Sequence, residues 1–366
     1  MLLFLTLGLL AVCLAHLSFL RKNDIYLYCS FFVILIVMAF QDAISTDFPQ
    51  YIDEFEAMLD GRMHASLFRS RAERLDSTEA GWFLLNYGLG SLIPSFHAVA
   101  FVALGFYCLT LIKLIRMVVP DTYRWLAVAY FYLGPILFNM SGIRQTVAIG
   151  FFIMAVCCFM ETDSFWRALV WILLGALFHN SILFAIVLFP LVFLKKGEGK
   201  SIYVYEGVFA LLFIVASFIG AKYQAALFEL SNTFFAENAD SYANYLNEVK
   251  DMSYSLKSLI RLAFPLGFAM LALPVADRKE FTFLVYLIVG QILSAFFGFE
   301  GSLQRMSLYC TVFAIPSFMI IANHIKVNWL RYTFCAGTIF LNAYLFWVML
   351  KDVQYSSYLD YHTIFF

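Results

Sequence analysis

Residues 125–160 read WLAVAYFYLGPILFNMSGIRQTVAIGFFIMAVCCFM, and this stretch decides the fold class. We assign its two strongly apolar runs to helices at 125–139 and 146–160. The short polar segment between the runs carries a permanent cation, Arg144. Long apolar blocks are typical of membrane-spanning helices, which need roughly 20 residues to cross a bilayer. The stretch therefore predicts two membrane helices joined by a short connection with an arginine at its edge.

The composition extends this prediction to the whole chain. Of its 366 residues, 63% are hydrophobic and 13% are charged, against about 25% charged residues in an ordinary soluble domain. The seven cysteines all fall in apolar runs and form no CxxC pair, so we interpret them as core residues rather than as a disulfide framework or a metal cluster. We predict one all-α, polytopic membrane domain over residues 1–366, with no nucleic-acid partner.

The apolar blocks predict about twelve membrane helices, whose ends are fixed only to within several residues. We expect them at 2–20, 25–43, 95–115, 125–139, 146–160, 167–179, 180–194, 202–220, 258–275, 281–298, 306–323 and 332–350.

Basic residues in the short loops predict the orientation. Cytoplasmic loops are enriched in Lys and Arg, and this assigns Arg21-Lys22, 113–124, 195–200, 278–279 and 326–331 to the cytoplasm. Alternation then places the other connections outside, including two long ones at 44–94 and 221–257. We expect these two exterior loops to cover a lateral cavity that admits a lipid-linked glycan, since loops of this length are usually functional or contain short helices.

Five helices that enter from the outside begin beside a basic residue: His97, Arg144, His179, Arg261 and Arg305. A cation is unfavourable at this position for two reasons. Positive charge is favoured on the cytoplasmic side, and the helix dipole is itself positive at the N-terminus. Arginines and helix N-termini together make a good receptor for a diphosphate. We predict that Arg144 and Arg305 converge on one diphosphate, with Arg261 as a third ligand. The alternative is that these arginines only contact lipid headgroups.

The residues around Arg144 would complete such a receptor. Ser141 and Gly142 would expose backbone N–H groups of the next helix to the anion. Gln145 would orient Arg144 or contact a sugar, or serve simply as a polar residue at a helix start.

Several motifs resemble the EpsG family, whose members are membrane proteins of bacterial exopolysaccharide synthesis related to the Wzy-type polymerases of O-antigen and capsule. Ser141-Gly142-Ile143-Arg144-Gln145, with Ala148, resembles its S-G-x-R-Q-x-x-A signature. The other matching elements, which follow in the family's order, are Asp47 with Tyr51, Glu79, the F-H-x-S turn around His179, and QRMSLY with Arg305 and Tyr309. The resemblance covers roughly residues 40 to 325.

The resemblance implies a glycosyltransferase at the outer face of the bacterial inner membrane. Such a polymerase moves a growing glycan from undecaprenyl diphosphate to the non-reducing end of a lipid-linked repeat unit. It implies an undecaprenyl-diphosphate-linked oligosaccharide as substrate, membrane lipid as surroundings and a chain-length regulator as a protein partner. The departing diphosphate needs cations, and the acceptor hydroxyl needs a base. The exterior candidates for that base are Asp47, Glu79, His179 and Glu300, of which position favours Glu79 or Asp47.

Other classes remain open at this stage. Many helices and buried cations also fit a transporter or flippase, although the sequence shows no repeat between halves. A membrane O-acyltransferase acting on the glycan is a third class. The sequence contains no Asp-x-Asp, HExxH, GxSxG or P-loop motif, so we expect no metal and no cofactor.

Overall fold

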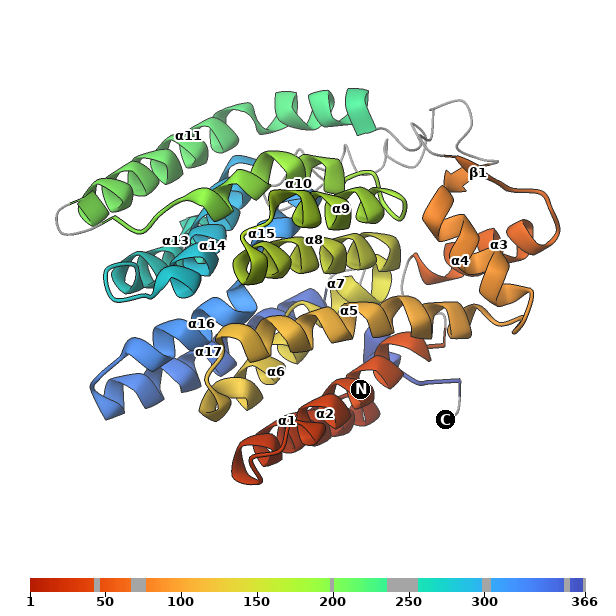
Figure 1. The fold of residues 1–366 in the computed structure, drawn as a ribbon, viewed down its shortest axis with the longest axis horizontal. Helices are drawn as coiled ribbons and strands as arrows, with labels where there is room; N and C mark the ends of the chain where they lie inside the picture. Colours follow the sequence, from red (N-terminus) through yellow and green to blue (C-terminus); the bar gives the residue numbers. More distant parts are fainter. Residues whose placement is uncertain are drawn as a thin grey trace. The chain divides into compact units, whose positions relative to one another are not determined.

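The computed structural model describes residues 1–42, 47–66, 77–197, 201–235, 256–297, 304–351 and 356–364. Helices dominate this part of the chain, which confirms the all-α class (Figure 1). By its contacts the chain divides into two compact units, Met1–Ile186 with Ile325–Phe366, and Val187–His324.

The first unit contains most of the helices and the two strands. Its elements are α1 (Leu2–Leu20), α2 (Ile25–Ala39), α3 (Phe48–Leu59), β1 (His64–Ser66), β2 (Ser77–Glu79), α4 (Ala80–Gly90), α5 (Phe96–Val118), η2 (Asp121–Tyr123), α6 (Arg124–Leu133), α7 (Ile136–Ser141), α8 (Ile143–Thr162), α9 (Phe165–Ala176), α17 (Asn328–Met349) and η4 (Ser356–Asp360). The helix α10 (Ile182–Leu188) begins in this unit and ends in the other.

Many helices of the first unit pack against helices that are close to them in the sequence. Helix α1 packs against α2, α2 against α5, α5 against α8, and α8 against α9, while α6 lies between α1 and α17 (Figure 1). Helix α8 is buried along most of its length, as an apolar helix at the centre of a bundle should be. It begins with the Ser-Gly-Ile-Arg segment, so this packing fixes the position of Arg144.

The second unit is built around one helix. Its elements are η3 (Phe189–Phe193), α11 (Ser201–Phe235), α13 (Leu256–Ala272), α14 (Arg278–Phe297), α15 (Gln304–Thr311) and α16 (Ala314–His324). Helix α14 packs against all of the others, and its side chains are largely buried.

Seven helical segments in the described residues are long and apolar enough to cross a membrane: Leu2–Leu20, Phe96–Val118, Ile143–Thr162, Ser201–Tyr223, Arg278–Phe297, Arg305–His324 and Asn328–Met349. Four shorter apolar helices accompany them, at Ile25–Ala39, Phe165–Ala176, Ile182–Phe193 and Arg261–Ala272. The structure therefore confirms a polytopic membrane protein but not the count of about twelve spans.

Proline and glycine explain part of this difference. The predicted helix 125–139 is interrupted at Gly134-Pro135, which separates α6 from α7. The predicted helix 180–194 changes from α to 3-10 geometry at Phe189, next to Pro190. Proline lacks the N–H that a continuous helix requires, so each apolar run becomes two shorter pieces.

The two predicted exterior loops contain regular structure. Within 44–94 the structure has α3, α4 and a parallel pairing of β1 with β2. Within 221–257 the helix α11 does not end at residue 220 but continues to Phe235, with a kink at Tyr223. Residues 221–235 contain no Gly or Pro, so nothing in the sequence stops the helix there.

Different polar contacts mark the two ends of the first unit. At one end lie the Met1 amino group, which donates to the Leu359 carbonyl at 3.0 Å, and Gln41, which donates to the Met140 carbonyl at 2.9 Å. At the other end Asp24 binds both Arg116 and Arg124. We call the first of these the site end, because Met140 lies just before the segment that carries Arg144.

Candidate functional site

The connection between α7 and α8 at Gly142 places Arg144 at the site end. Gly142 follows α7 and immediately precedes α8, so Arg144 lies in the first turn of α8. Only 9% of Arg144 is exposed. The Gly142 N–H donates to the Phe138 carbonyl at 2.8 Å, so it is not available to the anion that the sequence predicts there. Ser141 and Gln145 are buried on either side.

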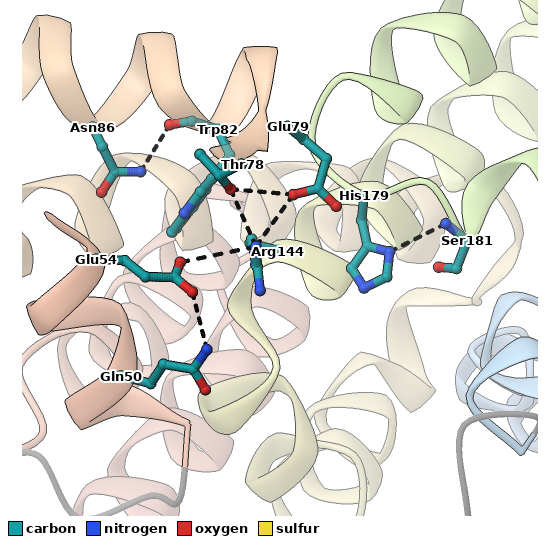
Figure 2. A network of polar contacts seen from close by, with 9 residues as sticks. All are labelled: Gln50, Glu54, Thr78, Glu79, Trp82, Asn86, Arg144, His179 and Ser181. Atoms are coloured by element: carbon teal, nitrogen blue, oxygen red, sulfur yellow. Dashed lines mark hydrogen bonds and ion pairs between the residues drawn. The ribbon is translucent and has the colours of Figure 1, made fainter. Parts of the chain in front are cut away.

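The Arg144 guanidinium faces three side-chain oxygens. Its Nη1 lies 3.2 Å from Glu79 Oε2, 3.2 Å from Thr78 Oγ1 and 3.8 Å from Glu54 Oε2 (Figure 2). The Thr78 hydroxyl donates in turn to Glu79 Oε2 at 3.3 Å, and the Gln50 amide donates to Glu54 Oε1 at 3.0 Å. Glu54, Glu79 and Arg144 thus form one buried ion cluster.

The charged groups of the ion cluster are buried. Glu54 and Glu79 are 7% and 6% exposed, and both share one guanidinium. Removing charges from water is costly, so each buried charge needs a partner. A buried cluster of charged side chains from three separate elements marks a candidate functional site.

Aromatic rings pack beside the Arg144 guanidinium. The Arg144 guanidinium carbon lies 5.4 Å from the Tyr51 ring centroid, and the Tyr51 ring meets the fully buried Trp82 edge-on at 5.7 Å. Burial raises the pKa of Tyr51 to about 12 although Arg144 lowers it, so this hydroxyl stays protonated at neutral pH. Tyr51 is therefore a cation–π partner of Arg144 rather than a base.

The β1–β2 pair and α4 together position Glu79. Glu79 pairs with Ser66 as the last residue of β2 and directly precedes α4. Gly81, two residues after Glu79, lies so close to Leu177 that an added Cβ would be 2.8 Å from the Leu177 carbonyl oxygen. That oxygen accepts the N–H groups of Gly81 and Trp82, at 2.7 and 3.2 Å. The start of α4 is thus bound to the turn that contains His179.

His179 is held in one orientation by its own turn. The Ser181 N–H donates to His179 Nδ1 at 3.1 Å. We infer from this bond that the proton of the neutral imidazole is on Nε2. Figure 2 shows the ring on the same side of the ion cluster as Glu79. His179 is half-buried and presents an N–H, so it is suited to donate a hydrogen bond.

A comparison with known families shows to which family the chain belongs. The EpsG family matches residues 24–363, which include every residue of the ion cluster. The chain belongs to the EpsG family. Comparisons with curated proteins and with solved structures gave no match.

In this EpsG-family chain the first unit contains most of the predicted site residues. Arg144, Glu79 and Tyr51 are in direct contact with one another or with shared partners, and Asp47 lies close enough to influence the Tyr51 hydroxyl. His97 belongs to the core instead, since its ring packs against Phe40 and Phe48 and its Nδ1 contacts the Ala39 carbonyl.

The remaining predicted residues belong to the second unit. Arg261 on α13 and Arg305 on α15 are exposed, and Tyr309 on α15 is fully buried. Because Arg144 lies in the first unit, the convergence of Arg144 and Arg305 stays a prediction. Glu300 lies outside the described residues. No group of three potential metal ligands occurs within the described ranges.

Sequence reasoning missed Glu54, although a signal was present. Helix α3 is amphipathic, and its buried face contains Phe48, Tyr51, Phe55 and Met58. Glu54 lies on that same face, one turn after Tyr51. A carboxylate on the apolar face of an amphipathic helix needs a buried partner. In this EpsG-family chain that partner is Arg144.

Proposed function

We propose that this EpsG-family protein is a glycosyltransferase that polymerises a lipid-linked polysaccharide. It transfers the growing glycan from undecaprenyl diphosphate to the non-reducing end of a lipid-linked repeat unit. Family membership and the membrane-spanning helices support polysaccharide synthesis at a membrane. The observation that carries the proposed chemistry is the Glu79 carboxylate, which Arg144 and Thr78 hold in place at the site end.

The proposed reaction needs a base and a way to stabilise the leaving group. The acceptor hydroxyl attacks the anomeric carbon, its proton passes to Glu79, and the bond from that carbon to the diphosphate oxygen breaks with the electron pair on the diphosphate. Glu79 can serve because its partners fix its orientation. His179 Nε2–H is suited to donate to a developing negative charge.

The geometry favours a positioning role for Arg144 over a diphosphate contact. The carboxylates of Glu79 and Glu54, whose Oε2 atoms lie 3.2 and 3.8 Å from Arg144 Nη1, already neutralise the guanidinium. They would repel a diphosphate at the same place. Arg261 and Arg305 of the second unit stay the predicted cations for the leaving group.

We also propose the location and the partners. The end of the first unit that contains Lys113, Arg116 and Arg124 would face the cytoplasm by the positive-inside rule, and the ion cluster would then face outward from the bacterial inner membrane. The substrate would reach it from the lipid as an undecaprenyl-diphosphate-linked oligosaccharide, and a chain-length regulator would be the protein partner. No metal or cofactor takes part in the proposed reaction.

The test is a reconstituted polymerisation assay. Purified protein in liposomes receives the lipid-linked repeat extracted from a strain that lacks the protein. We expect chains of several repeats and release of undecaprenyl diphosphate. Glu79→Gln should reduce the rate by about 10²–10⁴, the usual contribution of a general base. Arg144→Lys, which keeps the charge but loses the planar fork, should also reduce the rate.

The matched control is Glu56→Gln, because Glu56 is an exposed acid on α3. This variant should polymerise at the wild-type rate. Movement of intact single repeats across the bilayer without chain growth would indicate a flippase instead. Acylated repeats of unchanged length would indicate an acyltransferase. Wild-type chain growth by Glu79→Gln would contradict the assignment of the base.

A further inference from the structure

Helix α4 has apolar side chains on its exposed face, although it is too short to span a membrane. Its 11 residues correspond to about 16 Å of helix, roughly half of a hydrocarbon core of about 30 Å. Leu84 is 67% exposed, and Tyr87, one turn later, is also exposed. The chain has no charged residue from 80 to 112, which includes the whole helix. A surface helix in water normally has polar and charged residues on its exposed face, so water is not the expected environment of α4.

The neighbouring helix α3 has the opposite kind of exposed face. The two helices pack against each other (Figure 1). The exposed residues of α3 include Gln50, Asp53 and Glu56, whereas those of α4 include Leu84 and Tyr87. Two packed helices that differ in this way are typical of a boundary between water and lipid, where the polar face stays hydrated and the apolar face enters the bilayer.

The connection that follows α4 continues the apolar surface into a membrane helix. Leu92 is 80% exposed, and Ile93 beside it is exposed too. Three residues after Ile93 begins α5, which is long and apolar enough to cross a membrane and exposes Val102 and Leu109 on its own surface. A spanning helix begins near the edge of the hydrocarbon core. The course of the chain therefore brings this apolar connection to the edge of the lipid.

We propose that α4 is a non-spanning membrane helix whose exposed side contacts phospholipid acyl chains in the leaflet at the site end. Its lipid face consists of Leu84, Tyr87, Leu92 and Ile93. A tyrosine suits this position, since its ring is apolar and its hydroxyl can reach the headgroups. A second copy of the chain or another protein would not explain why the lipid face continues into α5. The inference goes beyond the proposed reaction, because it holds for any activity of the ion cluster.

The lipid face has a consequence for the ion cluster. Glu79 directly precedes α4, and Glu54 comes from the buried side of α3. Both carboxylates thus come from a pair of helical segments that meets water on one side and lipid on the other. Under the proposed function, the diphosphate of a lipid-linked glycan lies at this same level of the bilayer. The substrate would then reach Glu79 laterally, along α4.

The test introduces the photoreactive amino acid p-benzoylphenylalanine at single positions of the full chain. The purified protein is placed in liposomes of phosphatidylethanolamine and phosphatidylglycerol and irradiated, which joins the benzophenone to the nearest C–H bonds. We expect the chain to gain the mass of one phospholipid when the probe replaces Leu84 or Leu92. Leu109 on α5 is the positive control, and the yields at 84 and 92 should be comparable to its yield. Glu56, exposed on α3, is the matched control and should give no phospholipid product.

Both test positions are exposed, so the probe does not disturb the core, and either position is sufficient for the test. The inference is overturned if 84 and 92 give no phospholipid product while 109 does, because the lipid face would then lie in water. A product of twice the chain mass at 84 also overturns it, since a second copy would cover the face. Equal phospholipid yields at 56 and 84 overturn it as well, because the two helices would not differ. Failure of the polymerisation assay would refute the proposed function and leave this result unchanged.

Discussion

His179 shows how one backbone contact defines the chemistry of a side chain. The Ser181 N–H occupies Nδ1 at 3.1 Å, so the imidazole can take a second proton there only by breaking the turn. The residue is therefore suited to donate through Nε2 rather than to act as a base. Among the candidate bases of the first unit, this leaves Glu79 with the better geometry.

Two substitutions of His179 separate its turn contact from its Nε2 group. The amide oxygen of His179→Asn can replace Nδ1, so the turn should stay intact while the Nε2–H is lost. We expect normal membrane levels and a loss of chain extension of about 10²–10⁴. His179→Gln can replace the Nε2 group but not the Nδ1 acceptor, so it should retain more activity with lower thermal stability. Polymer length and melting temperature in detergent measure the two effects. Full activity in His179→Asn would show that His179 only stabilises the turn and that its Nε2–H takes no part in the reaction.

At the scale of secondary structure, the joint between α4 and the α9–α10 turn controls the site. Gly81 allows the backbone of α4 to approach Leu177 so closely that two N–H groups share one carbonyl. The residues on either side of this joint are Glu79 and His179. The distance between the two polar groups therefore depends on the absence of a side chain at Gly81.

Gly81→Ala should separate α4 from the turn. The new Cβ would lie 2.8 Å from both the Cβ and the carbonyl oxygen of Leu177, and a backbone atom cannot move aside cheaply. We expect a loss of about 1–3 kcal/mol in the free energy of unfolding and a large loss of chain extension. Thermal unfolding in detergent and the polymerisation assay measure these changes.

Gly88→Ala is the control on the same helix, because an added Cβ there meets nothing within 4 Å. This variant should be as stable as the wild type or more stable by about 0.5–1 kcal/mol, since alanine favours a helix. If both variants behave alike, close approach at Gly81 is not what joins the two elements.

At the scale of the whole molecule, charge separates the two ends of the first unit. The ion cluster and Met1 lie toward the site end, where the Tyr361 hydroxyl donates to the Val37 carbonyl and the Tyr358 hydroxyl to Gln41. Arg116, Arg124 and Lys113 lie at the other end with acidic partners. The positive-inside rule then predicts that the site end faces outward.

Cysteine labelling tests this orientation. Asp60, in the turn after α3, and Asp121, in η2, both have well-exposed side chains, 63% and 60%. We expect Asp60→Cys to react with an impermeant thiol reagent in intact spheroplasts, and Asp121→Cys to react only after lysis. The parent protein supplies the background, because Cys13 and Cys29 are exposed on their helices. The reverse labelling pattern would place the ion cluster in the cytoplasm and exclude an outer-face polymerase.

The sequence alone determined the all-α membrane class and the segment that carries Arg144. Both depend on local information, since the bilayer selects long apolar runs and a cation between two such runs is conspicuous. The ends of spans were less certain because Pro135 and Pro190 divide apolar runs that composition treats as continuous. Glu79 and Tyr51 were identified through family motifs, and the EpsG match over residues 24–363 confirmed that resemblance.

Only the tertiary structure decided what Arg144 contacts. Its partners Glu54 and Glu79 are 90 and 65 residues away in the chain, and no periodicity connects residues at such distances. The sequence predicted a diphosphate for Arg144 because the arginine lies at the start of a helix that enters from the outside, next to backbone N–H groups that favour an anion. A buried guanidinium needs an anion from some source, and whether that anion is a substrate or a carboxylate of the same chain depends on how α3, β2 and α8 pack together.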